Sequence, residues 1–253
     1  MVLSKECIHR IANDVKYIIK NPLTSENIYY KHDENEILKG YALIIGNPDT
    51  PYSYGYYFFE FNFPEKYPFE PPIVRFYTND GRMRFNPNLY TSGKVCLSIL
   101  NTWKGEGWTS CQNITSILIT LSAVLNDNPL LNEPGIREDN PSINSYNLLL
   151  NYKNIEFSIL KQISILFQLE SELSGSDKSI EDFTGHHLFL LLFKDIMCNN
   201  FKKNKDLIKN KIESLKNDIE NNTQLCVNTY NLNFELSYEK IIKKFNKYIN
   251  LIN

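Results

Sequence analysis

Two segments of the chain space their apolar residues as one face of a helix does. Residues 4 to 20 follow this pattern, and Ser4 can cap the helix that they form. Residues 113 to 125 follow it as well. We therefore predict two amphipathic helices, whose buried faces carry Ile8, Ile11, Val15, Ile18 and Ile19 in the first and Ile114, Ile117, Leu118, Leu121 and Leu125 in the second.

Between the two helices, aromatic and β-branched runs replace the helical spacing. The runs ILKGYALIIG, YGYYFFEFNF and IVRFYT occupy most of the region from 37 to 77, with turn residues between them. This pattern predicts three consecutive antiparallel strands. The segment PEKYPFEPP that joins the last two is a stiff loop, because proline fixes φ and lacks a backbone donor.

Beyond residue 141 the whole pattern indicates helices. We predict them at 154 to 169, at 187 to 201, along a lysine-rich amphipathic segment from 208 to 219, and at 237 to 252. The segment SELSGSDKS, 171 to 179, is the only one with the composition of a linker. We therefore expect a core domain at 1–170 and a helical C-terminal extension at 171–253.

Composition and charge narrow the class of protein. The 253 residues are 42% hydrophobic and carry a formal net charge of −2, so the basic excess of a nucleic-acid-binding protein is missing. The N-terminal residues are charged throughout, and no apolar run reaches the roughly 20 residues that span a bilayer. We expect a protein of the cytoplasm or nucleus, without a nucleic-acid or membrane partner.

The cysteines are expected to be reduced thiols. They stand at 7, 96, 111, 198 and 226, an odd number with wide spacing and no C-x-x-C pair. This arrangement argues against both a disulfide framework and a zinc site. His186 and His187 are adjacent, so a helix would point them to different faces, and we expect no metal site.

One cysteine, Cys96 in RFNPNLYTSGKVCLSILNTW, stands among asparagines and without a histidine. A cysteine hydrolase needs a base, usually histidine, and none of His9, His32, His186 and His187 lies between 33 and 185. A thiol without its own base suits a reaction in which the acyl group arrives already as a thioester. Thioester exchange is nearly isoenergetic and demands little driving force.

The chain resembles the ubiquitin-conjugating enzymes in a series of motifs that occur in the same order: YPFEPP, FNPNLY, GKVCLSIL, a downstream tryptophan and a proline-rich hinge. The resemblance covers residues 4 to about 150. Three features are similar to the Z-type subgroup and to the conjugating domain of the giant inhibitor-of-apoptosis proteins. They are Asn86 in place of the usual histidine, the segment LNTWKGEGW and the segment NPLLNEPG. The tail resembles the Z-type extension more loosely, in SYNLLLNYKNIEFSIL and SYEKIIKKFNKYI.

The resemblance implies an α+β fold with an N-terminal helix, a four-stranded antiparallel meander, a catalytic loop and C-terminal helices. It also implies that Cys96 accepts ubiquitin, or a related modifier such as a tandem ubiquitin-like protein, from an activating enzyme. Cys96 would then pass the modifier to a substrate lysine or to a ligase cysteine. The expected partners are the activating enzyme, the modifier, a ligase and protein substrates. The activating enzyme uses the ATP, so no cofactor is expected here.

Other site residues follow from the same resemblance. Asn88 matches the motif asparagine, whose amide donates to the oxyanion or holds the loop that does so. Asn86 is expected to be a turn residue that bonds its own backbone. Asp127, Asn132 and Glu133 fall in the segment that corresponds to the family's gate. We choose Glu133 as the catalytic group there, with a solvated loop charge as its alternative.

Partner surfaces are predicted by position. Lys5, His9 and Lys16 form a polar stripe that would face the activating enzyme, unless it is only a solvated helix face. Phe69 matches the loop aromatic that ligases contact, and a buried loop anchor is its alternative role. Ser110 and Cys111 fall in the second ligase loop, where the family usually has Ser-Pro-Ala.

The sequence is compatible with two other functions. One is a catalytically inactive variant of the family that only binds ubiquitin, although such variants lack the cysteine. The other is a cysteine hydrolase, which would need His186 or His187 beside Cys96.

Overall fold

The computed structural model describes residues 3–219 and 223–252, and the chain forms two compact units. Residues 1–45 and 57–126 make up the first unit, and residues 46–56 and 127–253 make up the second. The chain therefore enters the second unit twice. These units divide at other positions than the predicted boundary at residue 170, and the division into 1–170 and 171–253 stays a prediction.

The first unit begins with helix α1 (Lys5–Lys20), close to its predicted start. The hydroxyl oxygen of Ser4 accepts from the backbone N–H of Cys7 at 3.1 Å, which satisfies one of the free donors of the first turn. The predicted apolar face is wrong at two positions, since Ile8 is 38% exposed and Ile19 is 72% exposed. The buried face runs slightly further round the helix, through Cys7, Ile11, Asp14 and Ile18.

A four-stranded sheet follows, in the order β1-β2-β3-β4. The strands are β1 (Ile28–His32), β2 (Lys39–Ile45), β3 (Tyr56–Asn62) and β4 (Ile73–Phe76). β1 and β2 pair antiparallel with Ile28 opposite Ile44, and β3 and β4 pair antiparallel with Phe59 opposite Phe76. The apolar runs predicted the last three strands. The mixed sequence IYYKH of β1 has no such run, and only the family resemblance implied this strand.

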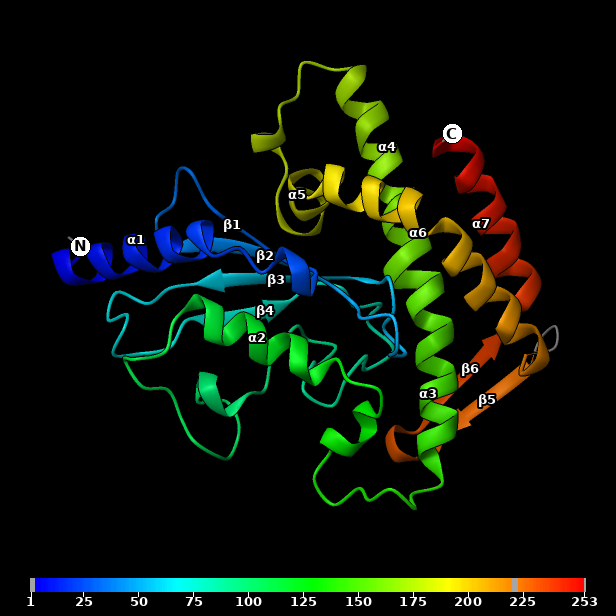
Figure 1. Cartoon of the computed structure of the whole chain (residues 1–253). Coiled ribbons are helices and arrows are strands. Elements are labelled where there is room, and N and C mark those ends of the chain that lie inside the picture. Colours follow the sequence, from blue (N-terminus) through cyan, green and yellow to red (C-terminus); the bar gives the residue numbers. More distant parts are fainter. Residues whose placement is uncertain (1–2, 220–222, 253) are drawn as a thin grey trace. The chain divides into compact units, whose positions relative to one another are not determined.

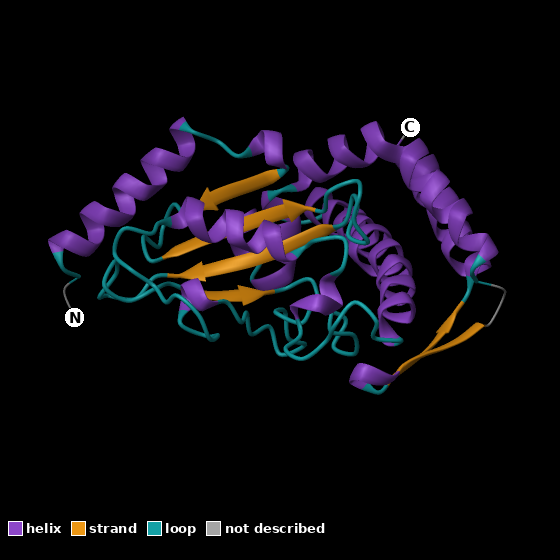
Figure 2. Cartoon of the chain, turned by 60° about the horizontal axis from the view of Figure 1, so that its bottom comes forward, coloured by secondary structure: helices purple, strands orange, loops and turns teal. Residues whose placement is uncertain are grey.

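Helix α2 (Ile114–Val124) lies across one face of this sheet (Figures 1 and 2). It begins with a capping box, in which Asn113 and Ser116 each accept a hydrogen bond from the other's backbone N–H. The predicted helical face is buried, with Ile117, Leu118 and Leu121 fully covered. Phe58, Phe59 and Phe61 of β3 are also fully buried. The core of the first unit is therefore an aliphatic helix on an aromatic sheet.

Helices make up most of the second unit. Residues 142–174 form one continuous helical stretch: α3 (Ser142–Lys153), a π-helical segment (Asn154–Lys161) and α4 (Gln162–Ser174). The segment predicted at 187 to 201 is instead two helices, α5 (Gly185–Leu192) and α6 (Lys194–Ser214), which meet at Phe193. The last helix is α7 (Tyr238–Ile252), close to the prediction.

The prediction that everything beyond residue 141 is helical is wrong. β5 (Thr223–Val227) and β6 (Leu232–Leu236) form an antiparallel hairpin, with a short 3-10 turn, Asn228–Tyr230, at its tip. Figure 2 shows it as two strands that lead into that helical turn. The N–H of Ser237 donates to the hydroxyl of Tyr152 at 3.1 Å, which ties the end of the hairpin to α3.

The segment from 46 to 56 belongs to the helical unit through side-chain bonds. The amide of Asn154 donates to the carbonyl of Ser53 at 2.9 Å, and the hydroxyl of Tyr56 donates to the carbonyl of Met197 at 3.1 Å. Among the residues that the structure describes, no helix combines the length and apolar character needed to cross a membrane.

Candidate functional site

The segment before Cys96 is a set of nested turns in the first unit. The N–H of Leu89 donates to the carbonyl of Asn86 at 2.9 Å, and the N–H of Tyr90 donates to the carbonyl of Lys94 at 2.9 Å. Gly93 closes the inner turn at φ +84°, and a Cβ there would lie 3.0 Å from the carbonyl oxygen of Phe76. The motif requires glycine here because this φ strains other residues and the sheet edge leaves no space.

Asn88 and Cys96 are joined by two hydrogen bonds. The side-chain Nδ2 of Asn88 donates to the carbonyl oxygen of Cys96 at 2.7 Å, and the N–H of Cys96 donates to the carbonyl of Asn88 at 2.8 Å. Oδ1 of Asn88 is buried and has no hydrogen-bond partner in the part of the chain that the structure describes. One of the two amide hydrogens is thus used to hold the Cys96 backbone, and Nδ2 carries a second.

Asn86 is fully buried and bonds in two directions. Its Oδ1 accepts from the N–H of Asn88 at 2.8 Å, which is the bond to its own turn that the sequence predicted. Its Nδ2 also donates to the carbonyl of Val124 at 2.7 Å, at the end of α2. Asn86 therefore ties the turn before Cys96 to the helix behind it.

The segment after Cys96 is closed by the hydroxyl of Thr102. This oxygen accepts from the N–H of Leu97 at 2.9 Å and lies 2.9 Å from the carbonyl of Val95, to which it can donate. Cys96 itself is only 2% exposed, whereas Cys111 and Cys226 are exposed. The thiol is fixed in a closed loop with little free surface.

The histidines are bonded elsewhere or lie on the surface. Nε2 of His186 is 2.5 Å from Oε1 of Gln162, and burial, with a smaller contribution from His187, lowers the pKa of His186 to about 4. His32 contacts the hydroxyl of Tyr30 and the carbonyl of Ile37, both at 2.9 Å. His9 is exposed on α1. A cysteine hydrolase would need an imidazole beside the Cys96 thiol. The ring of His186 is instead hydrogen-bonded to the side chain of Gln162.

The predicted partner residues on α1 are all at the surface. Lys5, His9 and Lys16 are exposed, opposite the buried face of the helix. No motif or spacing in the sequence indicated Arg10, whose guanidinium donates to the carbonyl of Ser110 at 2.6 Å and to the carbonyl of Gln112. Arg10 thereby holds the second predicted ligase loop against α1.

The two loops assigned to ligase binding are linked to each other. Phe69 is 66% exposed, so it does not serve as a buried anchor. The indole Nε1 of Trp108 donates to the carbonyl of Pro68 at 2.6 Å. Ser110 and Cys111 are exposed on the other loop. One tryptophan bond therefore holds the two loops together and leaves their side chains at the surface.

Glu133 belongs to the second unit, at the end of a short 3-10 helix (Pro129–Asn132). The hydroxyl of Tyr230 donates to its Oε2 at 2.5 Å. The ring of Tyr230 contacts the ring of Tyr146 edge-on, with centroids 6.0 Å apart. The carboxylate is thus held by the tip of the β5–β6 hairpin. Helical spacing gave no signal for this contact, because Tyr230 lies in a segment predicted as helical.

Among the residues described, no cluster of three or more histidine, cysteine, aspartate or glutamate side chains is arranged to hold a metal ion. The Cys96 site consists of a thiol, two amide side chains and backbone groups. Such groups can hold a reactive thiol and offer hydrogen-bond donors to a developing oxyanion.

Known proteins that are similar to this chain belong to the family that these motifs resemble. A family model described as ubiquitin-conjugating enzyme matches residues 10–144, just over half of the chain. Ubiquitin-conjugating enzyme E2 Z of Xenopus tropicalis is 37% identical over 184 residues, which cover 71% of this chain and 58% of that protein. The proteins of that name from Danio rerio and Homo sapiens are 42% and 38% identical over 137 and 157 residues. These matches cover 54% and 61% of this chain and 41% and 44% of the relatives, so the chain spans about half the length of the relatives it matches.

Proposed function

The chain belongs to the family of ubiquitin-conjugating enzymes, most similar to the Z-type, and from this premise we propose that it carries ubiquitin or a related modifier as a thioester on Cys96. The observation that supports the proposal is the pair of hydrogen bonds between Asn88 and Cys96. They fix the backbone of the one cysteine that lies in the family's catalytic motif.

In the charging step, the thiolate of Cys96 attacks the thioester carbonyl that joins the modifier to the activating enzyme. A new S–C bond forms at Cys96, and the thiolate of the activating enzyme leaves. The bond broken and the bond formed are of the same kind, so the step needs no cofactor on this chain. ATP is used earlier, by the activating enzyme.

In the discharge step, a neutral amine attacks the Cys96 thioester. The C–N bond forms, the S–C bond breaks, the Cys96 thiolate leaves, and the amine loses its proton to a base or to water. Lysine in solution has a pKa near 10.4, so a group that orients or deprotonates the amine would speed this step. We assign the oxyanion donor to Asn88 and assistance to the amine to Glu133. A ligase cysteine is the other acceptor, and we place the protein in the cytoplasm or nucleus.

The partner surfaces are proposals of the same kind. Lys5, His9 and Lys16 would contact the activating enzyme, and Phe69, Ser110 and Cys111 would contact a ligase. Their exposure on the first unit supports these assignments. The modifier is ubiquitin or a tandem ubiquitin-like protein.

The deciding experiment is incubation with activating enzyme, ATP and ubiquitin, followed by non-reducing gel electrophoresis. We expect an adduct that dithiothreitol removes, and Cys96→Ser should instead form a slower adduct that resists dithiothreitol. Cys111→Ser and Cys226→Ser are matched controls, because both thiols are more exposed than Cys96. Full-strength thioester on Cys96→Ala would refute the assignment, and hydrolysis of ubiquitin conjugates without any adduct would favour the hydrolase.

A further inference from the structure

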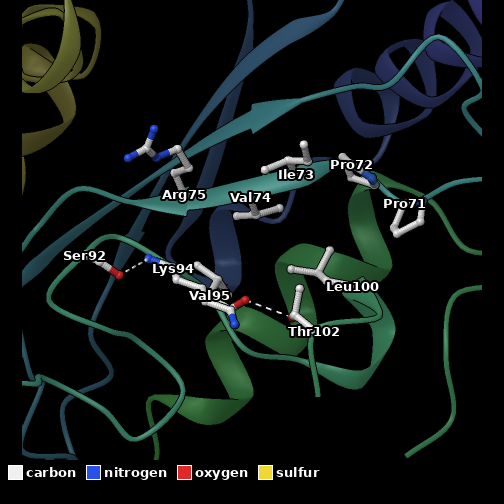
Figure 3. A pocket seen from close by; sticks show the side chains of 10 residues that line it. All are labelled: Pro71, Pro72, Ile73, Val74, Arg75, Ser92, Lys94, Val95, Leu100 and Thr102. Carbon is white, nitrogen blue, oxygen red and sulfur yellow. Dashed lines mark hydrogen bonds between the residues drawn. The ribbon is translucent and has the colours of Figure 1, made fainter. Parts of the chain in front are cut away.

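The two peptide groups on either side of the Cys96 Cα are held at all four of their polar atoms. Asn88 bonds two of them: its carbonyl accepts from the N–H of Cys96 at 2.8 Å, and its Nδ2 donates to the carbonyl of Cys96 at 2.7 Å. Thr102 bonds the other two with one oxygen. Its Oγ1 accepts from the N–H of Leu97 and donates to the carbonyl of Val95, both at 2.9 Å. Figure 3 draws the bond to Val95 as a dashed line.

This arrangement fixes the backbone of Cys96. A residue has two soft backbone rotations, φ and ψ, and each of them turns one of the flanking peptide planes. Asn88 bonds one atom of each plane, and Thr102 bonds the other atom of each. Neither plane can therefore rotate without breaking a hydrogen bond. The direction of the Cα–Cβ bond, and with it the place of the sulfur, depends on both planes.

A short turn brings Thr102 back beside the thiol. Ser98–Leu100 form a 3-10 helix, and Asn101 follows in the left-handed region at φ 56°, which asparagine adopts more readily than most residues. The N–H of Thr102 then donates to the carbonyl of Leu97 at 3.2 Å. The hydroxyl is thus anchored through its own backbone, whereas a water molecule in its place would not be attached to the loop.

The packing of Thr102 points to a role other than that of a core residue. Thr102 is exposed, while Val95, Cys96 and Leu97 are only 2%, 2% and 4% exposed. Its methyl group therefore adds little to the core. The contribution that distinguishes Thr102 is the hydroxyl, which ties together the backbone groups of two buried residues on opposite sides of the thiol.

We propose that Thr102 is a positioning residue of the reaction, whose hydroxyl orients Cys96 for both of its steps. In charging, the sulfur is held where the incoming thioester carbonyl can reach it. In discharge, the new thioester carbonyl is held near the second hydrogen of Asn88 Nδ2. Thr102 acts in both steps through the backbone of Cys96. Its effect on the rate rests on the proposed function, and its effect on the thiol is testable without it.

The kinetic test compares two substitutions at this position. Thr102→Val keeps the shape of the side chain and removes the hydroxyl, whereas Thr102→Ser keeps the hydroxyl. Thr102→Val should lower the kcat of charging about tenfold at unchanged KM for the activating enzyme, because a misplaced sulfur costs rate and not partner binding. Discharge to free lysine should fall by a similar factor. Thr102→Ser should restore both rates to near the wild-type values.

Thr78→Val is the matched control for stability. The hydroxyl oxygen of Thr78 also accepts from a backbone N–H of the first unit, that of Phe58 at 3.0 Å. Thr78 is fully buried, so its loss should lower the free energy of unfolding at least as much as Thr102→Val does. Urea unfolding measures both losses. The kcat of Thr78→Val per folded molecule should nevertheless stay at the wild-type value.

The reactivity of the thiols gives a test that needs no activating enzyme. The proteins are treated with iodoacetamide, and alkylation of each cysteine is followed by mass spectrometry. Local loosening in Thr102→Val should let this small reagent reach Cys96 about tenfold faster, although the same variant is charged more slowly. Cys7 is fully buried in the same unit and reports global opening, and Cys111 is exposed and reports the reagent. Both should keep their wild-type rates.

Three results would overturn the proposal. The first is an unchanged kcat of charging in Thr102→Val. The second is an equal loss of kcat in Thr102→Ser or in Thr78→Val. The third is alkylation that rises together at Cys96 and Cys7, which would assign the hydroxyl to stability alone.

If wild-type enzyme forms no thioester, the proposed function fails instead, and alkylation then decides the role of Thr102. Faster alkylation of Cys96 in Thr102→Val, without a change at Cys7, supports the role. Equal alkylation of Cys96 in wild type and Thr102→Val refutes it.

Discussion

The side-chain amide of Asn88 donates to the carbonyl oxygen of Cys96 at 2.7 Å, eight residues along the chain. This bond gives Asn88 a structural role in addition to the oxyanion role that the motif implies. Nδ2 holds the Cys96 backbone with one hydrogen and has a second for a reacting oxygen. The two roles predict different kinetic effects and are separable.

We predict that Asn88→Ala leaves thioester formation largely intact and slows discharge to free lysine about 100-fold, the cost of one lost oxyanion donor. It should also lower the free energy of unfolding by about 1 to 3 kcal/mol, because the buried carbonyl of Cys96 loses its partner. Single-turnover discharge and urea unfolding measure the two effects.

Asn88→Asp is the matched variant, since it keeps the shape of the side chain and removes the donor. It should slow discharge at least as much as Asn88→Ala. If charging and discharge fall by the same factor in both variants, the residue only holds the loop.

Asn86 is predicted to act on stability alone. Asn86→Ala removes bonds to the N–H of Asn88 and to the carbonyl of Val124, both in a fully buried position. We expect a loss of roughly 2 to 4 kcal/mol in the free energy of unfolding. Charging and discharge, measured per folded molecule, should decline together. Selective loss of discharge would instead make Asn86 a catalytic residue.

The sequence predicted those parts of the fold that depend on local patterns. The helical face of Ile117, Leu118 and Leu121 is buried as predicted, and the aromatic run YGYYFFEFNF contains strand β3, as its pattern predicted. The hairpin was missed because its strands, TQLCV and LNFEL, are short, carry asparagine and cysteine, and stand between helical segments. The break at Phe193 has neither glycine nor proline to signal it.

The long-range side-chain hydrogen bonds could not be predicted from the sequence, for a different reason. Arg10 bonds carbonyls about 100 residues away, and Tyr230 bonds Glu133 across 97 residues. Such pairs depend on how the elements pack, and no spacing along the chain encodes them. The catalytic motif around Cys96 is local, and this is why its residues could be named from the sequence.

We predict that the hairpin tip positions Glu133. Tyr230→Phe removes the hydroxyl bond and keeps the ring against Tyr146, so discharge to free lysine should slow in the same direction as in Glu133→Gln. Both single variants should slow discharge most at lower pH, where few lysines are neutral. The double variant should be no slower than the worse single variant.

Tyr248→Phe is the control for Tyr230→Phe, because the hydroxyl of Tyr248 likewise donates a single bond, to Ser164 at 2.7 Å. It should keep the wild-type discharge rate. An additive double variant of Tyr230 and Glu133 would show that the tyrosine acts elsewhere.

The exposed cations of α1 are predicted to draw in the activating enzyme. Reversing Lys5 and Lys16 to glutamate should slow charging mainly through KM, and added salt should lower the wild-type rate because it screens exposed charges beyond about 8 Å. Lys243→Glu with Lys247→Glu makes the same change in net charge on α7 and should leave charging unchanged. If both double variants are charged at the same rate, the lysines of α1 do not contact the activating enzyme and form only a solvated face of the helix.

Acid destabilisation is predicted at His186 of the second unit. Burial lowers the pKa of His186 to about 4, against 6.5 for an exposed histidine. Above pH 6.5 the imidazole is neutral in both the folded and the unfolded chain, so it gives no pH dependence there. Between pH 6.5 and 4 the unfolded chain takes up a proton that the folded chain refuses, and stability falls as pH falls. Linkage gives a loss of about 2 kcal/mol between pH 7 and pH 5 from this group.

Urea unfolding at pH 7 and pH 5, followed through the helical signal, measures this loss. His186→Gln keeps an amide that can reach Gln162 and does not titrate, so the variant should lose about 2 kcal/mol less than wild type between the two pH values. His9→Gln replaces an exposed histidine of α1 and should lose as much as wild type. If His186→Gln and wild type lose the same amount, the ring takes up a proton in the folded state, and its bond to Gln162 does not keep it neutral.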